Sequence, residues 1–313
     1  MVRLSMGASD MKKFIINILI FFGIVAVVDM AAGKLFWFLQ STKAGGRTGA
    51  EYYACKESNE DVIIMGSSRA SHHYVPQTIS DSLGLSCFNA GQDGNGIIMQ
   101  YGRWKMISER YSPKIIIYDV NPSFDLAHND NMTYIDRLKP FCQNNQVESY
   151  VSMLFPLEHF KLYSRMYRYN YKFIEFIFDC SRVKNNGLQG YIPLEGYIRE
   201  EIVRDSLLFK KGEISFDNIK IKYLDELANE CKEHDVELLF VASPCFKGGK
   251  YNSMAFAPIQ AIADKYDFTF VNYYDSEYSY IVDLFKDSNH LNDKGARAFT
   301  AIIVNNLNRQ KMN

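Results

Sequence analysis

Residues 61–71 read DVIIMGSSRAS, and this stretch decides the fold that we expect for the chain. It begins with a continuous apolar run from Val62 to Met65, which is typical of a strand buried on both faces of a parallel sheet. Gly66 then permits a sharp turn, and Ser68 follows at the expected exit from strand to helix. A serine there lies at the carboxyl edge of the sheet, where open α/β folds keep their ligand sites and helix amides favour an anion. We therefore interpret Ser68 as a candidate nucleophile.

A second stretch, DSNHLNDKGA at residues 287–296, supplies what a nucleophilic serine needs. Gly-Ser-Ser after a strand is also an ordinary turn and N-cap sequence, so the serine alone does not establish catalysis. The nucleophile requires a base, and the base requires an orienting acid. Asp287 and His290, three residues apart on a loop that enters a helix, can provide both. This hypothesis predicts His290 within about 2.6 to 3.2 Å of the Ser68 hydroxyl.

Three segments resemble the conserved blocks of the SGNH, or GDSL-like, hydrolase superfamily: GSS at 66–68, FNAGQDG at 88–94 and DSNHLNDKGA. The resemblance covers about residues 60–130 and 235–310. It implies that Ser68 is the nucleophile, that Asp287 and His290 are its acid and base, and that Gly91 is the oxyanion-hole glycine of the second block.

Two departures from the family pattern concern the first and third blocks. The first block reads Gly-Ser-Ser in place of Gly-Asp-Ser, and the third lacks a clear Gly-x-Asn-Asp. Asn121, in the segment YDVNPSFD, is the nearest candidate for the third-block asparagine. The resemblance thus implies an oxyanion hole built from Ser68, Gly91 and Asn121.

The function implied by the resemblance is that of a serine esterase or O-acyl transferase, most plainly for acetyl groups on cell-envelope polysaccharide. This chemistry uses the protein's own side chains, and we expect no cofactor or metal. Whether water or a sugar hydroxyl takes the acyl group separates hydrolase from transferase, and both remain open. The alternative is a non-catalytic envelope protein that retains the fold to bind glycan or to assemble with an export complex.

Length and composition fit a folded domain with a sizeable core. The chain has 313 residues, of which 47% are hydrophobic and 14% aromatic, so global disorder is excluded. Its formal net charge is -1 and it contains no long basic run, so we expect no nucleic-acid partner.

The N-terminal region, residues 1–40, is expected to anchor the chain in a membrane. Lys12 and Lys13 precede an uninterrupted apolar run from Phe14 to Val28, and apolar character continues beyond it, further than in a typical cleaved signal. We interpret the region as an uncleaved signal anchor with its basic end inside, which places the catalytic domain outside the cytoplasm, in the periplasm. The small residues at 31–33 keep a cleaved signal peptide as the alternative.

Residues 41–60 contain three glycines and are interpreted as a linker. Residues 61–313 are then expected to form the hydrolase domain. Apolar runs predict strands at 62–65, 86–89, 114–120, 237–244 and 268–274, alternating with helical patterns.

The alternation of strands and helices predicts a parallel sheet with helices on both faces, in a flavodoxin-like three-layer α/β/α sandwich. An aromatic-rich, helical-looking insertion at about 125–216 interrupts it. We expect this insertion to form a lid or a wall for the substrate.

Several other polar residues are given no role in the chemistry. The six cysteines could pair in an oxidising compartment, although Cys87 and Cys231 fit small buried thiols better. Adjacent residues do not face one way on a helix or strand, so His72 and His73 are interpreted as ordinary surface or supporting residues and not as a metal pair. Three acids are interpreted as caps, turn residues or solvated charges. They are Asp119, Asp125 and Asp283.

Overall fold

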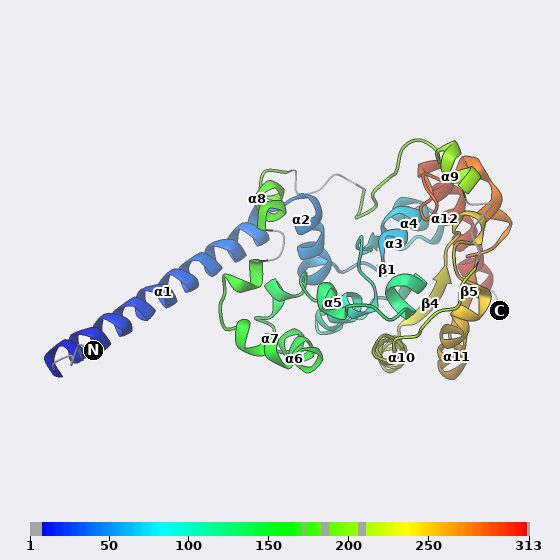
Figure 1. The fold of residues 1–313 in the computed structure, drawn as a ribbon. Coiled ribbons are helices and arrows are strands. Elements are labelled where there is room, and N and C mark those ends of the chain that lie inside the picture. Colours follow the sequence, from blue (N-terminus) through cyan, green and yellow to red (C-terminus); the bar gives the residue numbers. More distant parts are fainter. Residues whose placement is uncertain (1–7, 171–172, 183–187, 206–210, 312–313) are drawn as a thin grey trace.

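The computed structural model describes residues 8–170, 173–182, 188–205 and 211–311. Its five strands form one parallel sheet in the order β2-β1-β3-β4-β5 (Figure 1). This is the flavodoxin-like strand order, so the predicted fold class is confirmed. The strands are β1 (Val62–Gly66), β2 (Cys87–Asn89), β3 (Ile115–Asp119), β4 (Glu237–Ala242) and β5 (Thr269–Asn272).

The α-helices of the described chain range from single turns to a helix of 35 residues. They are α1 (Ala8–Thr42), α2 (Gly46–Tyr52), α3 (Ser68–His73), α4 (Pro76–Leu83), α5 (Ile97–Ser108), α6 (Asn145–Leu154), α7 (Pro156–Lys161), α8 (Phe173–Asp179), α9 (Glu200–Asp205), α10 (Asn218–Glu233), α11 (Ala257–Tyr266) and α12 (Asp293–Lys311). Short 3₁₀ or π turns occur at Tyr53–Glu57, Pro122–Leu126, Asn131–Tyr134, Lys139–Phe141, Tyr167–Tyr169, Phe246–Gly248, Ser253–Phe256, Glu277–Tyr280 and Val282–Leu284.

The two faces of the sheet are covered by different helices. Side chains alternate along a strand, so Ile63 and Met65 of β1 enter the core formed with α5, α10 and α11. Val62 and Ile64 enter the opposite core, with α4 and α12. Burial on both faces explains why β1 is a continuous apolar run without polar alternation.

The register of the central strands places two predicted site residues side by side. Gly66 at the end of β1 pairs with Asp119 at the end of β3. Ser68 and Asn121 each lie two residues beyond this pair, at the carboxyl edge of the sheet. This is also where the strand order reverses, the position at which doubly wound folds bind their ligands.

Gly66 is required by the turn between β1 and α3. Its φ is +137°, a conformation that residues with a side chain rarely adopt. A Cβ there would also lie 2.6 Å from the carbonyl oxygen of Asp119. The glycine therefore allows the chain to turn tightly enough to place Ser68 at the start of α3.

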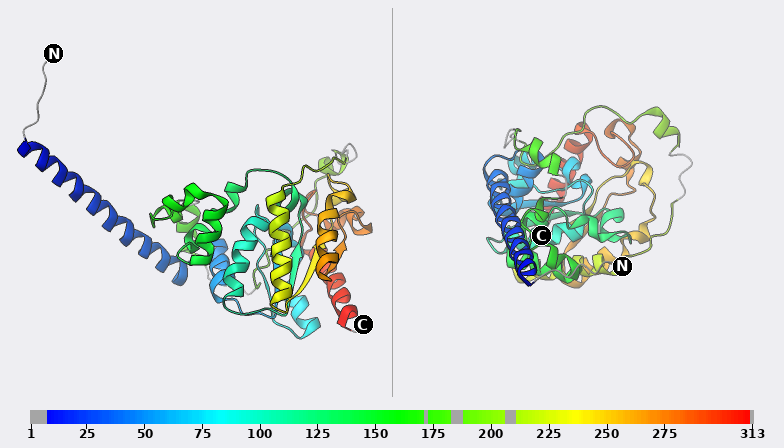
Figure 2. Two further views of the ribbon diagram at one scale, coloured as in Figure 1. Left: turned by 90° about the horizontal axis from the view of Figure 1, so that it is seen from below. Right: turned by 60° about the vertical axis from the view of Figure 1, so that its left-hand side comes forward.

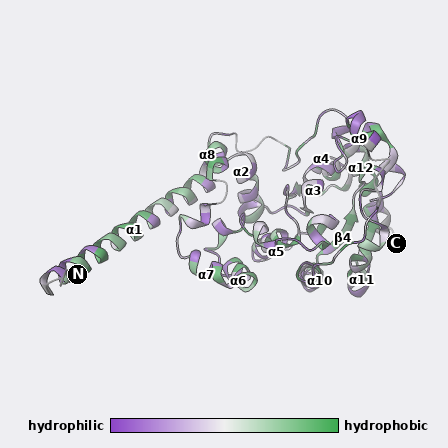
Figure 3. Cartoon of the chain, in the orientation of Figure 1, coloured by the Kyte–Doolittle hydropathy of each residue, from purple (hydrophilic) through white to green (hydrophobic). Residues whose placement is uncertain are grey.

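Helix α1 projects from the folded body as a single rod (Figures 1 and 2). Residues 9–28 are all exposed, whereas from Asp29 onward the helix packs on the rest of the chain. Ser9–Thr42 is the one helix among the described residues that is long and apolar enough to cross a membrane, and its apolar colouring is visible in Figure 3. Length and composition fit either a membrane anchor or a signal sequence.

Residues 41–60 were predicted to be a linker, but most of them are helical and pack against the body. Residues 46–57 form α2 and a π turn, in which Glu51, Ala54 and Cys55 are at most 5% exposed. Glu51 forms an ion pair with Arg137 at 3.5 Å. The segment joins α1 rigidly to the body because it packs into the core.

The insertion between β3 and α10 divides into two parts. Its first part, with α6, α7 and α8, lies beside α1, α2 and α5 (Figure 1). Its second part runs past the carboxyl edge of the sheet. There the amide of Ile192 donates to the carbonyl of Ser71, and the amide of Ile198 donates to that of Phe285. Only this second part is a wall beside the candidate site.

All six cysteines lie in the described ranges, and each is a free thiol. Five are buried and Cys180 is partly exposed. Burial raises the pKa of Cys142 to about 12, which keeps that thiol protonated and unreactive. The cysteines therefore serve as small apolar side chains in this structure.

Candidate active site

Ser68, His290 and Asp287 meet at the carboxyl edge of the sheet. Ser68 Oγ lies 2.8 Å from Nε2 of His290. The other ring nitrogen of His290, Nδ1, lies 3.0 Å from each carboxylate oxygen of Asp287. Ser68 is more than two hundred positions away from Asp287 and His290 in the sequence, and the fold brings the three side chains together. The arrangement is that of a nucleophile, its base and an orienting acid.

A short closed loop holds the acid and the base in place. The amides of Lys286 and Asp287 both donate to the carbonyl of His290. A bridge between Phe285 and Leu291 closes the loop behind them. The imidazole is consequently positioned by backbone hydrogen bonds as well as by its carboxylate.

Asp287 is held as an anion. Burial acts to raise its pKa, but the hydrogen bond and charge of His290 and the amides of Asn289 and His290 outweigh burial, so the pKa of Asp287 is lowered. Those two amides donate to Asp287 Oδ1 at 2.8 and 3.0 Å. A charged carboxylate at Nδ1 fixes the proton on that nitrogen and leaves Nε2 free to accept the Ser68 proton.

The structure contradicts the assignment of Gly91 as an oxyanion donor. The amide of Gly91 donates to Oδ1 of Asn89 at 2.9 Å, so it is already used within the fold. A Cβ at this position would lie 2.4 Å from the backbone nitrogen of Ser71. Gly91 is a glycine because its loop packs against the backbone of α3 and not because it faces the serine.

Two other donors stand beside the nucleophile. The amide of Ser68 is at the first position of α3, where a helix offers no intrahelical acceptor. Asn121 follows β3 and donates through Nδ2 to the hydroxyl of Ser67 at 3.0 Å. The Asn121 amide group carries a second N–H, so this residue can hold Ser67 and still offer a donor to a ligand.

His73 is fully buried behind the loop that carries His290, so of the two expectations for it, a surface or a supporting residue, the second holds. The amide of Leu291, next to His290, donates to His73 Nε2 at 3.0 Å. Nδ1 of His73 therefore carries the proton and donates to Ser243 Oγ at 2.8 Å. This link between α3, β4 and the loop makes His73 a positioning residue for His290.

Removing the ionisable ring of His73 should change how stability depends on pH. Burial, with the nearby Arg69 charge, holds the pKa of His73 well below its usual value. An unfolded histidine titrates near 6.5, so below that pH the unfolded state binds a proton that the native state does not. As the pH is lowered below 6.5, this group therefore decreases the free energy of unfolding of the wild type by about 1.4 kcal/mol per pH unit.

His73→Gln lacks this titration. We expect its destabilisation relative to the wild type to be largest at pH 7 to 8, and to shrink by about 1.4 kcal/mol per unit below pH 6.5. Denaturant unfolding of both proteins between pH 5 and 8 measures the difference in their free energies of unfolding. The other titrating groups are the same in both proteins, so their contributions cancel in this difference. A difference that is independent of pH would show that His73 is not buried as the neutral ring.

His72, the second histidine of the pair, is also buried and lines the other side of the base. Its ring centroid is 5.4 Å from that of His290. His72 Nδ1 donates to the carbonyl of Ile192 at 2.7 Å, and Nε2 lies 3.3 Å from Asp93. Burial raises the pKa of Asp93, but His72 and Arg47 outweigh this effect and lower it to about 2. His72 thereby ties the second-block loop to α3.

Two of the three acids that were interpreted as caps or solvated charges are fully buried. Asp119 lies 3.4 Å from Arg69, and both side chains are at most 2% exposed, so this pair is an internal ion pair that supports α3. Asp125 accepts from the amides of Asn121 and Ile97, each at 2.7 Å, which is a capping role. Asp283 is 71% exposed, as a solvated charge.

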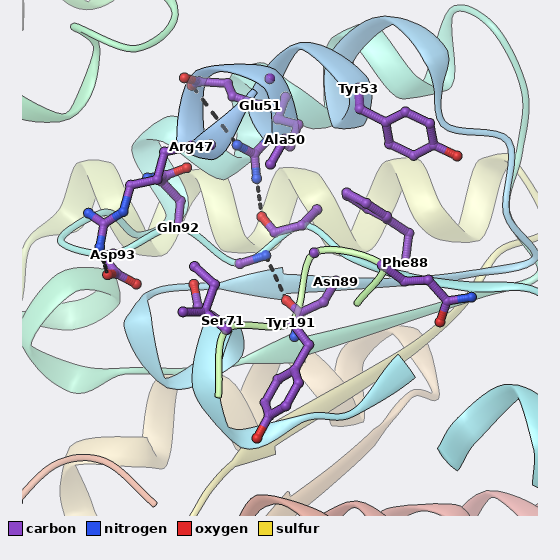
Figure 4. Close-up of a pocket in the computed structure, with 18 of the residues that line it drawn as sticks. Arg47, Ala50, Glu51, Tyr53, Ser71, Phe88, Asn89, Gln92, Asp93 and Tyr191 are labelled. Carbon is purple, nitrogen blue, oxygen red and sulfur yellow. Dashed lines mark hydrogen bonds and ion pairs between the residues drawn. The ribbon is translucent and has the colours of Figure 1, made fainter. Parts of the chain in front are cut away.

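A cavity of about 580 Å³ lies beside the candidate site and is separate from it (Figure 4). Its walls are α2 and the loop after β2, and Arg47 and Asp93 form an ion pair at one end. Ser68, Asp287 and His290 are not among its lining residues. His290 packs on the ring of His72 and not on the cavity, so the cavity does not include the candidate site.

No family model matches the sequence, and no curated protein does. Among solved structures, the chain is similar to the psychrotrophic esterase EstA from Pseudoalteromonas sp., at 11% identity and a TM-score of 0.43 over 80% of this chain and 98% of that one. It is also similar to a GDSL-like lipase from Bacteroides thetaiotaomicron, at 12% identity and a TM-score of 0.37 over 79% and 88% of the two chains. A third is a mutant of an acetyl-xylooligosaccharide esterase from Geobacillus, at 12% identity and a TM-score of 0.39 over 79% and 94%. These similarities are weak and assign no role to any residue of this chain.

Proposed function

We propose that the chain is an SGNH-type serine esterase in which Ser68 carries the acyl group. The observation that carries the proposal is the unbroken chain of contacts from Ser68 Oγ to His290 Nε2 and from His290 Nδ1 to Asp287. A serine in the first turn of α3 that served only the fold would have no reason to meet a histidine that is itself held by a carboxylate.

The first half of the reaction forms an acyl-enzyme. His290 Nε2 takes the proton of Ser68 as Oγ attacks the ester carbonyl, and the carbonyl π electrons move to the oxygen. When the tetrahedral intermediate collapses, the bond to the leaving alkoxide breaks and His290 returns the proton to it. Asp287 keeps the imidazole in the required tautomer and stabilises the imidazolium.

The second half transfers the acyl group to an acceptor. A water or alcohol loses its proton to His290 and attacks the acyl carbonyl. The bond between the acyl carbon and Ser68 Oγ then breaks, and His290 returns the proton to Oγ. In each half of the reaction the oxyanion accepts hydrogen bonds from the amide of Ser68 and from the second side-chain N–H of Asn121. A single donor of this kind is worth about 3 kcal/mol in the transition state.

The substrate we propose is an acylated glycan of the cell envelope, with acetyl as the acyl group. The exposed apolar part of α1 supports this, since it would hold the catalytic domain at a membrane. Lys12 and Lys13 support an extracytoplasmic location of that domain in this proposal, because basic residues favour the cytoplasmic end of an anchor. Transfer to a sugar hydroxyl and hydrolysis by water share every residue named above.

Intact-mass analysis of the full-length protein mixed rapidly with a chromogenic acetate ester tests the proposal. We expect a transient acetyl adduct on Ser68 that decays as acetate is released. Adding glycan oligosaccharides should speed the decay and yield acetylated sugar if the enzyme is a transferase. Release of chromophore with no adduct on Ser68 at any time, or with an adduct elsewhere, would contradict the mechanism.

A further inference from the structure

Helix α7 has its polar and apolar sides reversed relative to a helix on a soluble protein. Glu158 is 1% exposed and lies 3.2 Å from the ammonium of Lys139. Leu157 and Phe160, on the outer side, are 73% and 70% exposed. A surface helix in water turns its apolar side to the core, so the outer face of α7 is built for an apolar neighbour.

Helix α8 repeats the reversal. Asp179 is fully buried and accepts hydrogen bonds from the amide and hydroxyl of Thr48, at 2.9 and 2.7 Å. Ile174, Ile177 and Phe178 are 70%, 52% and 62% exposed. They lie at positions i, i+3 and i+4, so they form one face of the helix.

Both helices flank the base of α1 (Figure 1). Asp29 of α1 accepts from the hydroxyl of Ser164 at 2.6 Å and from the amides of Arg165 and Met166, just beyond α7. On the side of α8, the ring of Phe36 packs against Phe173 at 5.5 Å between centroids. The segment after α7 therefore lies where α1 leaves the body, and α8 lies further along α1, at Phe36.

The length of the exposed part of α1 indicates where the bilayer surface would lie, which is near Asp29 and the end of α7. The exposed apolar run from Phe14 to Val28 has fifteen residues. At about 1.5 Å each they span about 22 Å of a hydrocarbon core of roughly 30 Å, and Lys12 and Lys13 can reach the headgroups at its near end. The helix begins to contact the body at Asp29. If α1 crosses a bilayer, that bilayer ends near α7, whereas α8 packs on Phe36 and on Thr48 and lies further from the lipid.

We propose that the outer side of α7 forms a bilayer-facing patch that rests in the lipid interface beside the anchor. The patch consists of Leu157, Phe160 and Tyr163. Its occupant is lipid because the patch adjoins the membrane-crossing part of α1, and because Tyr163 and the half-exposed Lys161 are residue types that place a polar end at the headgroups. The catalytic domain is thus held in one orientation on the membrane and does not swing on a tether.

Tryptophan quenching by brominated lipid tests the patch. The full-length chain carrying Phe160→Trp is reconstituted in phosphatidylcholine vesicles with brominated acyl chains, and its emission is compared with that of the wild type, whose two tryptophans give the background. We expect the added emission to be blue-shifted and mostly lost in brominated vesicles. Met254→Trp is the matched control, since Met254 is 70% exposed but lies away from α1 near α11, and its added emission should remain.

The inference rests on the proposed membrane anchor, and flotation of the vesicles separates the two. A chain that floats with the vesicles but shows unquenched emission from the tryptophan introduced in α7 overturns the patch and leaves the anchor standing. A chain that does not float overturns both. Unquenched emission together with cross-linking of two chains through the patch would assign it to a second copy and reject lipid. Leu157→Trp repeats the measurement on α7 if the first variant does not fold.

Discussion

Replacing Ser68 by alanine is expected to lower kcat for ester cleavage by about 10⁴- to 10⁶-fold. The variant loses the only atom that forms the acyl-enzyme, and His290 then has no hydroxyl from which to take a proton at 2.8 Å. What remains is the stabilisation by the oxyanion donors and by binding. Initial rates with a chromogenic acetate ester, on protein whose unfolding midpoint matches that of the wild type, measure the effect.

Ser67→Ala is the matched control for this substitution. Ser67 is fully buried next to the nucleophile, and its hydroxyl accepts from Asn121, so its loss should disturb the orientation of Asn121 and cost only a small fraction of the Ser68 effect. Ser68→Ala with wild-type turnover would remove the serine from the mechanism. A larger loss from Ser67→Ala than from Ser68→Ala would show that the nucleophilic role has been given to the wrong neighbour.

Asp287→Ala should cost about 10³- to 10⁴-fold in kcat, less than the loss of the serine. Without the carboxylate, neither the tautomer nor the imidazolium of His290 is stabilised, but the serine and its base are still present. His290→Ala should match Ser68→Ala, because the two act as one unit. The double variant Ser68→Ala with Asp287→Ala should be no slower than Ser68→Ala alone. Losses that multiply would show that the two residues do not belong to one mechanism.

The sheet could be predicted from sequence because its strands are local signals. β1 and β3 are apolar runs that only burial on two faces explains, and each ends in the expected place. The pairing of Asp287 with His290 is also local, since three residues separate them. Their meeting with Ser68 required only the added expectation of a parallel sheet, whose carboxyl ends share one edge.

The errors concern contacts that depend on the whole fold. Gly91 was expected near the oxyanion because its segment resembles the family's second block. That resemblance does not say whether the amide is free, and here it donates to Asn89 while the glycine packs against the backbone of α3. For His73 the sequence left a surface and a supporting role open, because its partners Ser243 and Leu291 lie about 170 and 220 positions away. The glycines near residue 46 suggested a linker, yet the buried carboxylate of Glu51 finds its ion pair with Arg137 far along the chain.

Labelling of the folded, full-length protein with a fluorophosphonate, followed by peptide mapping, tests the central claim most directly. The reagent needs a serine hydroxyl activated by a neighbouring base, which here is His290. The account predicts one phosphonylated residue, Ser68, with labelling abolished in Ser68→Ala, strongly slowed in His290→Ala and retained in Ser67→Ala. Folded protein that stays unlabelled, or that carries the label on another serine, would contradict it.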